Sequence, residues 1–170
     1  MSALFEVGAG DVADTNDDWY TPPWVFDAAG IVFDLDVAAP VDPSRRTCPA
    51  REYLTPVEDG LAQDWGGGTV WCNPPFSQPA QWVARFAAHP AGLALLPALP
   101  RARWLGVLLG AADAVTLIDA QFGRPDGSAG HLRWPMMLAA RGALCVPAVG
   151  RVAAADKYAG GAYHVRPVTL

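Results

Sequence analysis

The sequence has few charged residues and no long uninterrupted apolar run. Charged residues make up 17% of the 170 residues and hydrophobic residues 52%, which excludes an intrinsically disordered chain. No apolar run approaches the ~20 residues that span a bilayer. Residues 1–18 are acidic and lack the basic and then apolar order of a signal sequence. We therefore expect one globular domain, no membrane partner and a cytoplasmic location.

Cysteine and histidine are scarce and scattered. The three cysteines have no paired spacing, so neither a disulfide framework nor a zinc knuckle is indicated (Cys48, Cys72 and Cys145). The three histidines also lack the spacing of metal ligands (His89, His131 and His164). We predict no metal.

The net charge of −5 argues mildly against a nucleic-acid partner, because neutralising phosphates supplies most non-specific affinity for nucleic acids. The distribution of charge weakens this argument, since many of the acidic residues precede residue 65. The second half can therefore present a basic side, although a solvated mixed surface explains any single one of its cations equally well. These cations are Arg85, Arg101, Arg103, Arg124, Arg133, Arg141, Arg151, Lys157 and Arg166.

The most informative stretch is Thr69-Val70-Trp71-Cys72-Asn73-Pro74-Pro75-Phe76. Its first four residues are apolar or β-branched and follow three glycines, so they predict a short buried strand. Pro74 and Pro75 lack backbone N–H groups and end that strand. Asn73 is thereby placed at the carboxyl end of a strand, where open α/β sheets bind their ligands.

These residue types suit methylation of a nucleobase amine. The amide oxygen of Asn73 and the carbonyl of Pro74 offer two acceptors that can converge on one NH₂ group. An exocyclic amine is a poor nucleophile, and two acceptors favour a nitrogen with a directed lone pair. Phe76 offers a flat face on which a flipped-out base can stack.

Asn73-Pro74-Pro75-Phe76 resembles the Asn/Asp/Ser-Pro-Pro-aromatic motif of methyltransferases that act on adenine N6 or cytosine N4. From about residue 17 to about residue 100 the pattern resembles the phage-type DNA N6-adenine methyltransferases, or Dam-like family. The other matching elements are Asp18-Trp19-Tyr20-Thr21-Pro22-Pro23, Asp34-Leu35-Asp36-Val37-Ala38-Ala39, Tyr53, Asp59-Gly60-Leu61 and Trp65. The resemblance implies the cofactor S-adenosyl-L-methionine, double-stranded DNA as partner, and a bacterial or phage-infected cell.

The segment from Trp19 to Gly30 predicts a short helix. Thr21 is suited to cap it, Pro22 to be its first residue, and Gly30 to end it. In the family the Thr-Pro-Pro segment lies beside the methionine end of the cofactor, which implicates Trp19, Tyr20, Thr21 and Pro22. Backbone N–H groups at a helix start suit the cofactor's carboxylate. The alternative is a structural cap with the tryptophans in the core.

Residues 31–40 predict the first strand of the sheet, because apolar and polar residues alternate before a run of small ones. We expect Asp36 to contact the cofactor, with Ala38 and Ala39 allowing close backbone approach. Asp34 could substitute, since strand alternation places both acids on one face. The Gly-x-Gly of the larger methyltransferase superfamily is missing, which leaves the cofactor's pose open.

Asp59 and Trp65 fall in the stretch that, by resemblance, lies against the adenosine of the cofactor. A carboxylate can accept hydrogen bonds from ribose hydroxyls, and an indole can stack on a purine. An ordinary turn at Asp59-Gly60 and a core position for Trp65 are equally acceptable. Only 37 residues separate Asp36 from Asn73 (73 − 36), so the elements between them must be abbreviated.

The second half predicts further alternating elements. A helix begins near Ser77 or Gln78 and uses Trp82 for core packing. The apolar run 92–99 predicts a central parallel strand buried on both faces. We also predict a helix at 104–112, a strand at 114–118, and a hairpin formed by 135–140 and 143–149.

DNA contacts are expected on the carboxyl side of the sheet. Arg101 and Arg103 follow the strand at 92–99 and are candidates for the DNA backbone. The glycine-rich segment 121–134 carries Arg124 and Arg133 and corresponds to the region where related enzymes contact the flipped base. No separate recognition domain fits in this length.

The expected fold is α/β, a single trimmed Rossmann-like methyltransferase domain with a mixed, mostly parallel sheet and helices on both faces. We assign residues 17–156 to it, 1–16 to a mobile arm and 157–170 to a tail. The expected reaction is methyl transfer to adenine N6 in DNA, with Asn73, Pro74, Pro75 and Phe76 as catalytic residues. A cytosine-N4 or RNA substrate and a catalytically silent nucleic-acid-binding subunit remain alternatives. The oligomeric state is not indicated.

Overall fold

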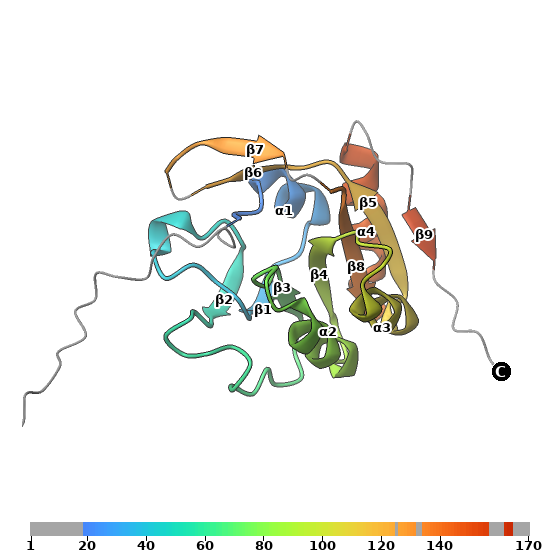
Figure 1. The fold of residues 1–170 in the computed structure, drawn as a ribbon, viewed down its shortest axis with the longest axis horizontal. Helices are drawn as coiled ribbons and strands as arrows, with labels where there is room; N and C mark the ends of the chain where they lie inside the picture. Colours follow the sequence, from blue (N-terminus) through green and yellow to red (C-terminus); the bar gives the residue numbers. More distant parts are fainter. Residues whose placement is uncertain (1–18, 125, 132–133, 157–161, 165–170) are drawn as a thin grey trace, which may run out of the picture.

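A seven-stranded sheet forms the centre of the protein, in the order β2-β1-β3-β4-β8-β5-β9 (Figure 1). The computed structural model describes residues 19–124, 126–131, 134–156 and 162–164. The strands of this sheet are β1 Phe33–Asp36, β2 Ala50–Tyr53, β3 Val70–Cys72, β4 Gly92–Pro97, β5 Ala114–Ile118, β8 Met136–Arg141 and β9 Ala162–His164. A separate two-stranded ribbon pairs β6 Gln121–Gly123 with β7 Ala129–His131. The helices are α1 Pro23–Ala29, η1 Pro43–Arg45, α2 Pro79–Ala88, α3 Arg103–Ala111 and α4 Val146–Ala155.

The sheet is mixed. Strands β2, β1, β3 and β4 pair in parallel, whereas β8 is inserted antiparallel between β4 and β5, and β9 pairs antiparallel with β5. Five of the seven strands, β1 to β5, therefore run in one direction. This arrangement confirms the predicted α/β class with a mixed, mostly parallel sheet and is compatible with a Rossmann-like fold.

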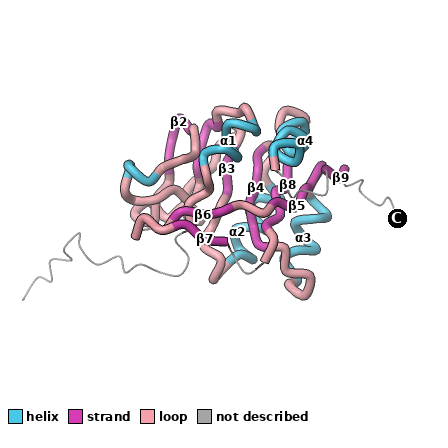
Figure 2. Tube along the Cα trace, turned by 90° about the horizontal axis from the view of Figure 1, so that it is seen from above, coloured by secondary structure: helices cyan, strands magenta, loops and turns pink. Residues whose placement is uncertain are grey.

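Helices cover both faces of the sheet, as predicted. One core cluster joins α1 and α4 to the sheet through side chains such as Phe26, Phe33 and Val149. The other joins α2 and α3 to the opposite face through side chains such as Phe86 and Leu108. Figure 2 shows α1 and α4 on one side of the strands and α2 and α3 on the other. Strand β4 lies between the two layers and is buried along its whole length.

The predicted hairpin at 135–149 is wrong in its second half. Met136–Arg141 forms β8 as expected, but Val146–Ala155 forms α4. Gly142, with φ of 81°, turns the chain out of the sheet, and Pro147 lies in the first turn of the helix. Val149 and Val152 then recur at helical spacing and are fully buried against the sheet. The continuous apolar run at 143–149 is therefore compatible with a buried helix as well as with a buried strand.

Strand β1 contains a bulge that alters the predicted alternation. The backbone N–H groups of Asp34 and Leu35 both donate to the Thr69 carbonyl, at 2.9 and 3.2 Å, so two residues oppose one. Phe33 and Leu35 accordingly pack into the two different core clusters, although they lie two residues apart. The prediction that Asp34 and Asp36 occupy one face by simple alternation is therefore wrong.

The region between β1 and β3 is abbreviated, as expected from its length. In the described structure it holds η1, β2 and turns, and no α-helix. At the other edge, β9 pairs with β5, so the sheet extends beyond the boundary expected at residue 156. The expected mobile arm 1–16 lies outside the described residues. No helix in the described ranges is long and apolar enough to cross a membrane.

Candidate active site

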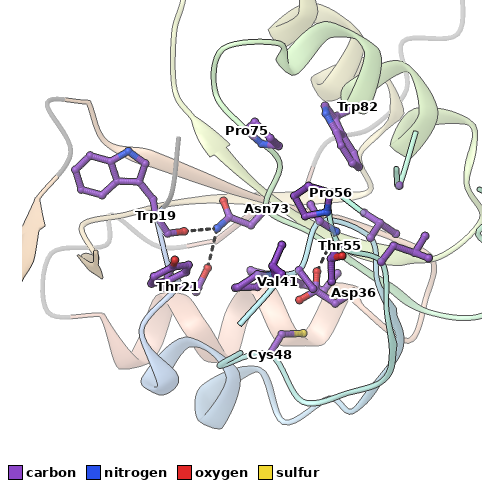
Figure 3. A pocket seen from close by; sticks show the side chains of 18 of the residues that line it. Trp19, Thr21, Asp36, Val41, Cys48, Thr55, Pro56, Asn73, Pro75 and Trp82 are labelled. Atoms are coloured by element: carbon purple, nitrogen blue, oxygen red, sulfur yellow. Dashed lines mark hydrogen bonds between the residues drawn. The ribbon is translucent and has the colours of Figure 1, made fainter. Parts of the chain in front are cut away.

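A cavity of about 740 Å³ opens at the carboxyl ends of β1, β2 and β3 (Figure 3). This volume is in the usual range for a small-molecule site. Its walls come from segments 19–21, 36–42, 54–56, 59–61 and the start of α2. Much of the lining comes from the connection between β1 and β3, which holds no α-helix.

The side chain of Asn73 lies in the wall of the cavity and is held by its nitrogen. Its Nδ2 donates to the Trp19 carbonyl at 2.9 Å and to Thr21 Oγ1 at 3.2 Å. Both contacts are drawn in Figure 3. Asn73 Oδ1 is buried and has no hydrogen-bond partner among the described residues. A buried acceptor without a donor is costly, so this oxygen is suited to an N–H group supplied by a ligand.

The remaining residues of the motif are placed differently. Pro75 lines the cavity beside Asn73, and Ser77 follows it in the wall. Pro74 and Phe76 are not among the residues that line the cavity. Phe76 is partly buried and packs against the core cluster on the α1 side. Asn73 and Pro75 therefore line the cavity, whereas Phe76 does not.

Trp19, Tyr20 and Thr21, which are predicted to contact the cofactor, line the cavity, but the helix start differs from the prediction. The first helical residue is Pro23 and the N-cap residue is Pro22, which is not in the lining. Thr21 does not cap α1, because its hydroxyl accepts a hydrogen bond from Asn73. Two successive prolines also remove two N–H groups from this helix start, which weakens the prediction that it binds a carboxylate.

Asp36 ends β1 and projects into the cavity as a buried acid. Its side chain accepts a hydrogen bond from the Ala38 N–H at 3.2 Å and is only 4% exposed. Burial raises the pKa of Asp36 to about 7, although hydrogen bonds from Ala38 and the Cys48 thiol and the charge of Arg46 oppose the rise. The same burial, with the nearby Asp36 carboxylate, raises the pKa of Cys48 well above its usual value. Asp36 therefore titrates near neutral pH.

Asp34 does not share this environment. Its carboxylate accepts hydrogen bonds from the Thr69 N–H at 2.8 Å and from Arg51 at 2.6 Å, outside the cavity. The hydrogen bonds from Thr69, with Arg51 as a further contribution, lower the pKa of Asp34. The prediction that Asp34 could substitute for Asp36 loses its structural basis, because the bulge separates the two side chains.

Residues 59–61 form a turn that packs against the end of β1. Asp59 and Leu61 line the cavity beside Ala38 and Ala39. A Cβ at residue 60 would collide with the Val37 carbonyl, so only glycine allows the turn to lie this close. Asp59 itself has φ of 57° and accepts a hydrogen bond from the Leu61 N–H at 3.2 Å. The turn is thus part of the cavity wall.

Trp65 lies behind the cavity. Its indole nitrogen donates to the Gly60 carbonyl at 2.8 Å, and its ring stacks on Trp82 with centroids 6.2 Å apart. Trp82, predicted only as a core residue, is both in the core cluster and in the cavity wall. The aromatic face available to a ligand is therefore that of Trp82, with Trp65 supporting it.

Comparison with known proteins identifies the family of this chain. The family described as DNA N-6-adenine-methyltransferase (Dam) matches residues 10–134, more than half of the chain. The chain belongs to this family. A curated relative, the DNA N-6-adenine-methyltransferase of Haemophilus phage HP1 (strain HP1c1), is 38% identical over 73 residues. That alignment covers 41% of this chain and 40% of the relative. No solved structure matches the chain.

Two arginines of this Dam family member stack on aromatic residues beside Asn73. The guanidinium of Arg124 lies 4.3 Å from the ring centre of Trp19, and that of Arg45 lies 5.7 Å from the ring centre of Tyr20. Arg45 Nη1 also donates to the Arg124 carbonyl at 3.2 Å. The ribbon is tied to this cluster, because Tyr20 and Gly123 exchange two backbone hydrogen bonds of 3.0 Å. A cationic and aromatic rim results, which we define as Trp19, Tyr20, Arg45 and Arg124.

The other predicted DNA contacts remain predictions. Arg101 and Arg103 are exposed beyond the carboxyl end of β4, outside the cavity, and Arg133 lies outside the described residues. Two further arginines in the second half of the sequence stabilise the fold through hydrogen bonds to backbone carbonyls. Arg85 donates to the carbonyls of Leu61 and Gln63, and Arg151 donates to the carbonyls of Ala28 and Ala29.

Sequence reasoning missed several residues of the cavity wall. Trp82 follows the Asn-Pro-Pro-Phe motif in the first turn of α2 and could have been found from that position. Thr47, Cys48 and Thr55 come from irregular segments whose path no local pattern predicts. Arg45, the last residue of η1, also lines the cavity. In the described ranges, no three His, Cys, Asp or Glu side chains are grouped as a metal site requires.

Proposed function

We propose that the protein transfers a methyl group from S-adenosyl-L-methionine to N6 of adenine in DNA. The observation that carries this proposal is the orientation of Asn73. Its nitrogen is engaged by Trp19 and Thr21, which leaves Oδ1 as a buried, unpartnered acceptor in the wall of a cavity that Asp36 also lines. Membership of the DNA N-6-adenine-methyltransferase family supports the same reaction.

Asn73 Oδ1 would accept a hydrogen bond from the adenine amine. Charge that develops on the nitrogen during transfer would strengthen this contact, so the interaction favours the transition state over the ground state. Because Oδ1 is buried in the structure, the base can reach it only if the groups that cover it shift. The Pro74 carbonyl supplies the second acceptor, and Phe76 would have to move with the loop to stack on the base.

The residues of the cavity fit S-adenosyl-L-methionine. When bound, this cofactor supplies a methyl group that is already activated on a sulfonium. Asp36 offers an acceptor for its hydroxyl or amino groups, and Ala38 and Ala39 leave room at the end of β1. Trp82 offers a face for the purine ring, and Asp59 a second carboxylate. Trp19, Tyr20 and Thr21 complete the wall on the side of Asn73.

The decisive test is product analysis after incubation with radiolabelled S-adenosyl-L-methionine and unmethylated double-stranded DNA. Label in N6-methyladenine supports the proposal. Label in N4-methylcytosine would keep the mechanism and change the base, since both substrates present an amine beside a ring nitrogen. Absence of label from DNA, with label in RNA or with cofactor binding alone, would contradict it.

We also propose that the rim binds the phosphates that flank the flipped base. Replacing Arg124 by alanine is expected to weaken DNA binding and to lower the slope of log affinity against log salt by about one, the loss of one phosphate contact. The measurement is DNA affinity by fluorescence anisotropy at several salt concentrations. Arg124→Lys separates charge from stacking, because it keeps the cation and loses the planar contact with Trp19.

A matched control for this variant is Arg51→Ala. Arg51 is also an exposed arginine, with a surface ion pair to Asp34 outside the cavity. Its loss is expected to leave the salt slope unchanged. Equal slopes for Arg124→Ala and the wild type would remove Arg124 from the DNA interface.

A further inference from the structure

The two partners of Asn73 Nδ2 fix which end of the amide reaches the ligand. A backbone carbonyl can only accept a hydrogen bond, so the atom 2.9 Å from the Trp19 oxygen must be the nitrogen donor. The Thr21 hydroxyl lies 3.2 Å from the same nitrogen and accepts from its second hydrogen. Both hydrogens of the amide are then used, and Oδ1 remains as the acceptor.

We infer that the Trp19 carbonyl and the Thr21 hydroxyl are positioning groups that select an amide at residue 73 and exclude a carboxylate. The wider motif of this class admits Asn, Asp or Ser at the corresponding position. In this chain an aspartate would direct one of its oxygens at the Trp19 carbonyl, and two acceptors would face each other in a buried place. This inference rests on the proposed role of Asn73 and names the two groups that orient its amide.

The positioning groups are themselves held by other elements. Thr21 is 3% exposed, and its carbonyl accepts a hydrogen bond of 2.7 Å from Thr47 Oγ1. The neighbouring Tyr20 is clamped to the ribbon by its two hydrogen bonds with Gly123. A segment fixed on both sides cannot easily turn its carbonyl away from residue 73. Figure 3 shows Trp19 and Thr21 approaching Asn73 from the same side.

The first test compares Thr21→Val with Thr21→Ser. Valine keeps the shape of threonine and lacks the acceptor, so we expect kcat to fall about tenfold through misalignment of the amide, a larger change than in the Kd of S-adenosyl-L-methionine. Serine restores the hydroxyl and is expected to recover most of the turnover that valine loses. Wild-type turnover in Thr21→Val, equal impairment in Thr21→Ser, or a loss confined to cofactor affinity would each overturn the role of Thr21.

The second test does not depend on activity and compares the melting temperatures of Asn73→Asp and Asn73→Ala between pH 4 and pH 8. An aspartate that is buried against a carbonyl has a raised pKa, so its charged form destabilises the fold. We expect the aspartate variant to lose stability relative to the alanine variant as pH rises above about 4, the ordinary pKa of an aspartate. A melting difference that does not change with pH would overturn the exclusion of a carboxylate.

Other titrating groups are controlled by the same comparison. The cavity wall also holds Asp36, Asp42, Arg45, Cys48 and Asp59, with Tyr20 beside them and Arg124 over Trp19. These groups are present in both variants, so the part of their titration that does not depend on residue 73 cancels in the difference. If the wild type methylates no nucleic acid, the proposed function fails, but the melting comparison still tests the selection of an amide.

Discussion

Replacing Asn73 with alanine is expected to reduce methyl transfer by about 10²- to 10³-fold, the usual loss when one preorganised group at the reacting atom is removed. The substitution deletes the only part of the side chain that can accept a bond from the base. It leaves Asp36, Ala38 and Trp82 of the cavity in place. Single-turnover rates should therefore fall, while the Kd of S-adenosyl-L-methionine stays within about twofold of the wild-type value.

The matched control for this variant is Gln81→Ala. Gln81 carries the same type of amide on the exposed side of α2 and does not line the cavity. Its loss should leave both turnover and affinity unchanged. Retained turnover in Asn73→Ala would remove Asn73 from catalysis, and a large loss of cofactor affinity would assign it to binding.

Replacing Asp36 with asparagine is expected to weaken S-adenosyl-L-methionine binding by about 10- to 100-fold, because a hydrogen bond to a charged group contributes about 1.5–3 kcal/mol. The substitution keeps the size of the side chain at the end of β1. Isothermal titration at pH 8 measures the change. Asp34→Asn is the matched control, since that carboxylate lies on the same strand outside the cavity and should not affect affinity once its folding is verified. Unchanged affinity in Asp36→Asn would move the role to Asp59.

The pKa of Asp36 predicts two dependences on pH. Its folded-state pKa of about 7 exceeds the ordinary value of 3.8, so the folded state binds more protons between these limits. The unfolding free energy of the wild type should therefore fall as pH rises from about 4 to about 7, and Asp36→Asn should lack this fall. Cofactor affinity of the wild type should rise as pH passes 7, because the carboxylate is the better acceptor. Flat profiles for the wild type would contradict both expectations.

Local patterns predicted the longer elements well because burial imposes a period on the sequence, but they did not predict the short strands β2, β6, β7 and β9. The strand Ala114–Ile118 matches its prediction at both ends, and α2 and α3 lie within a residue or two of theirs. The prediction failed where the period is ambiguous or interrupted. The run at 143–149 is apolar throughout, so it fits a buried helix as well as a strand. The bulge at Asp34 depends on the Thr69 carbonyl of another strand and leaves no local signal.

The sequence alone determined the location and chemistry of the candidate site. Proline after Asn73 ends β3 just before that residue, and because parallel strands end at the same edge of a sheet, the acid that closes β1 lies on the same edge as Asn73. These are consequences of backbone chemistry and chain length. The tertiary structure decided which end of the Asn73 amide is free, that Asp36 and not Asp34 enters the cavity, and that Trp82 forms the wall in front of Trp65. Those outcomes depend on hydrogen bonds and packing between segments distant in the sequence, such as Trp19 with Asn73 and Asp34 with Thr69, which no local pattern records.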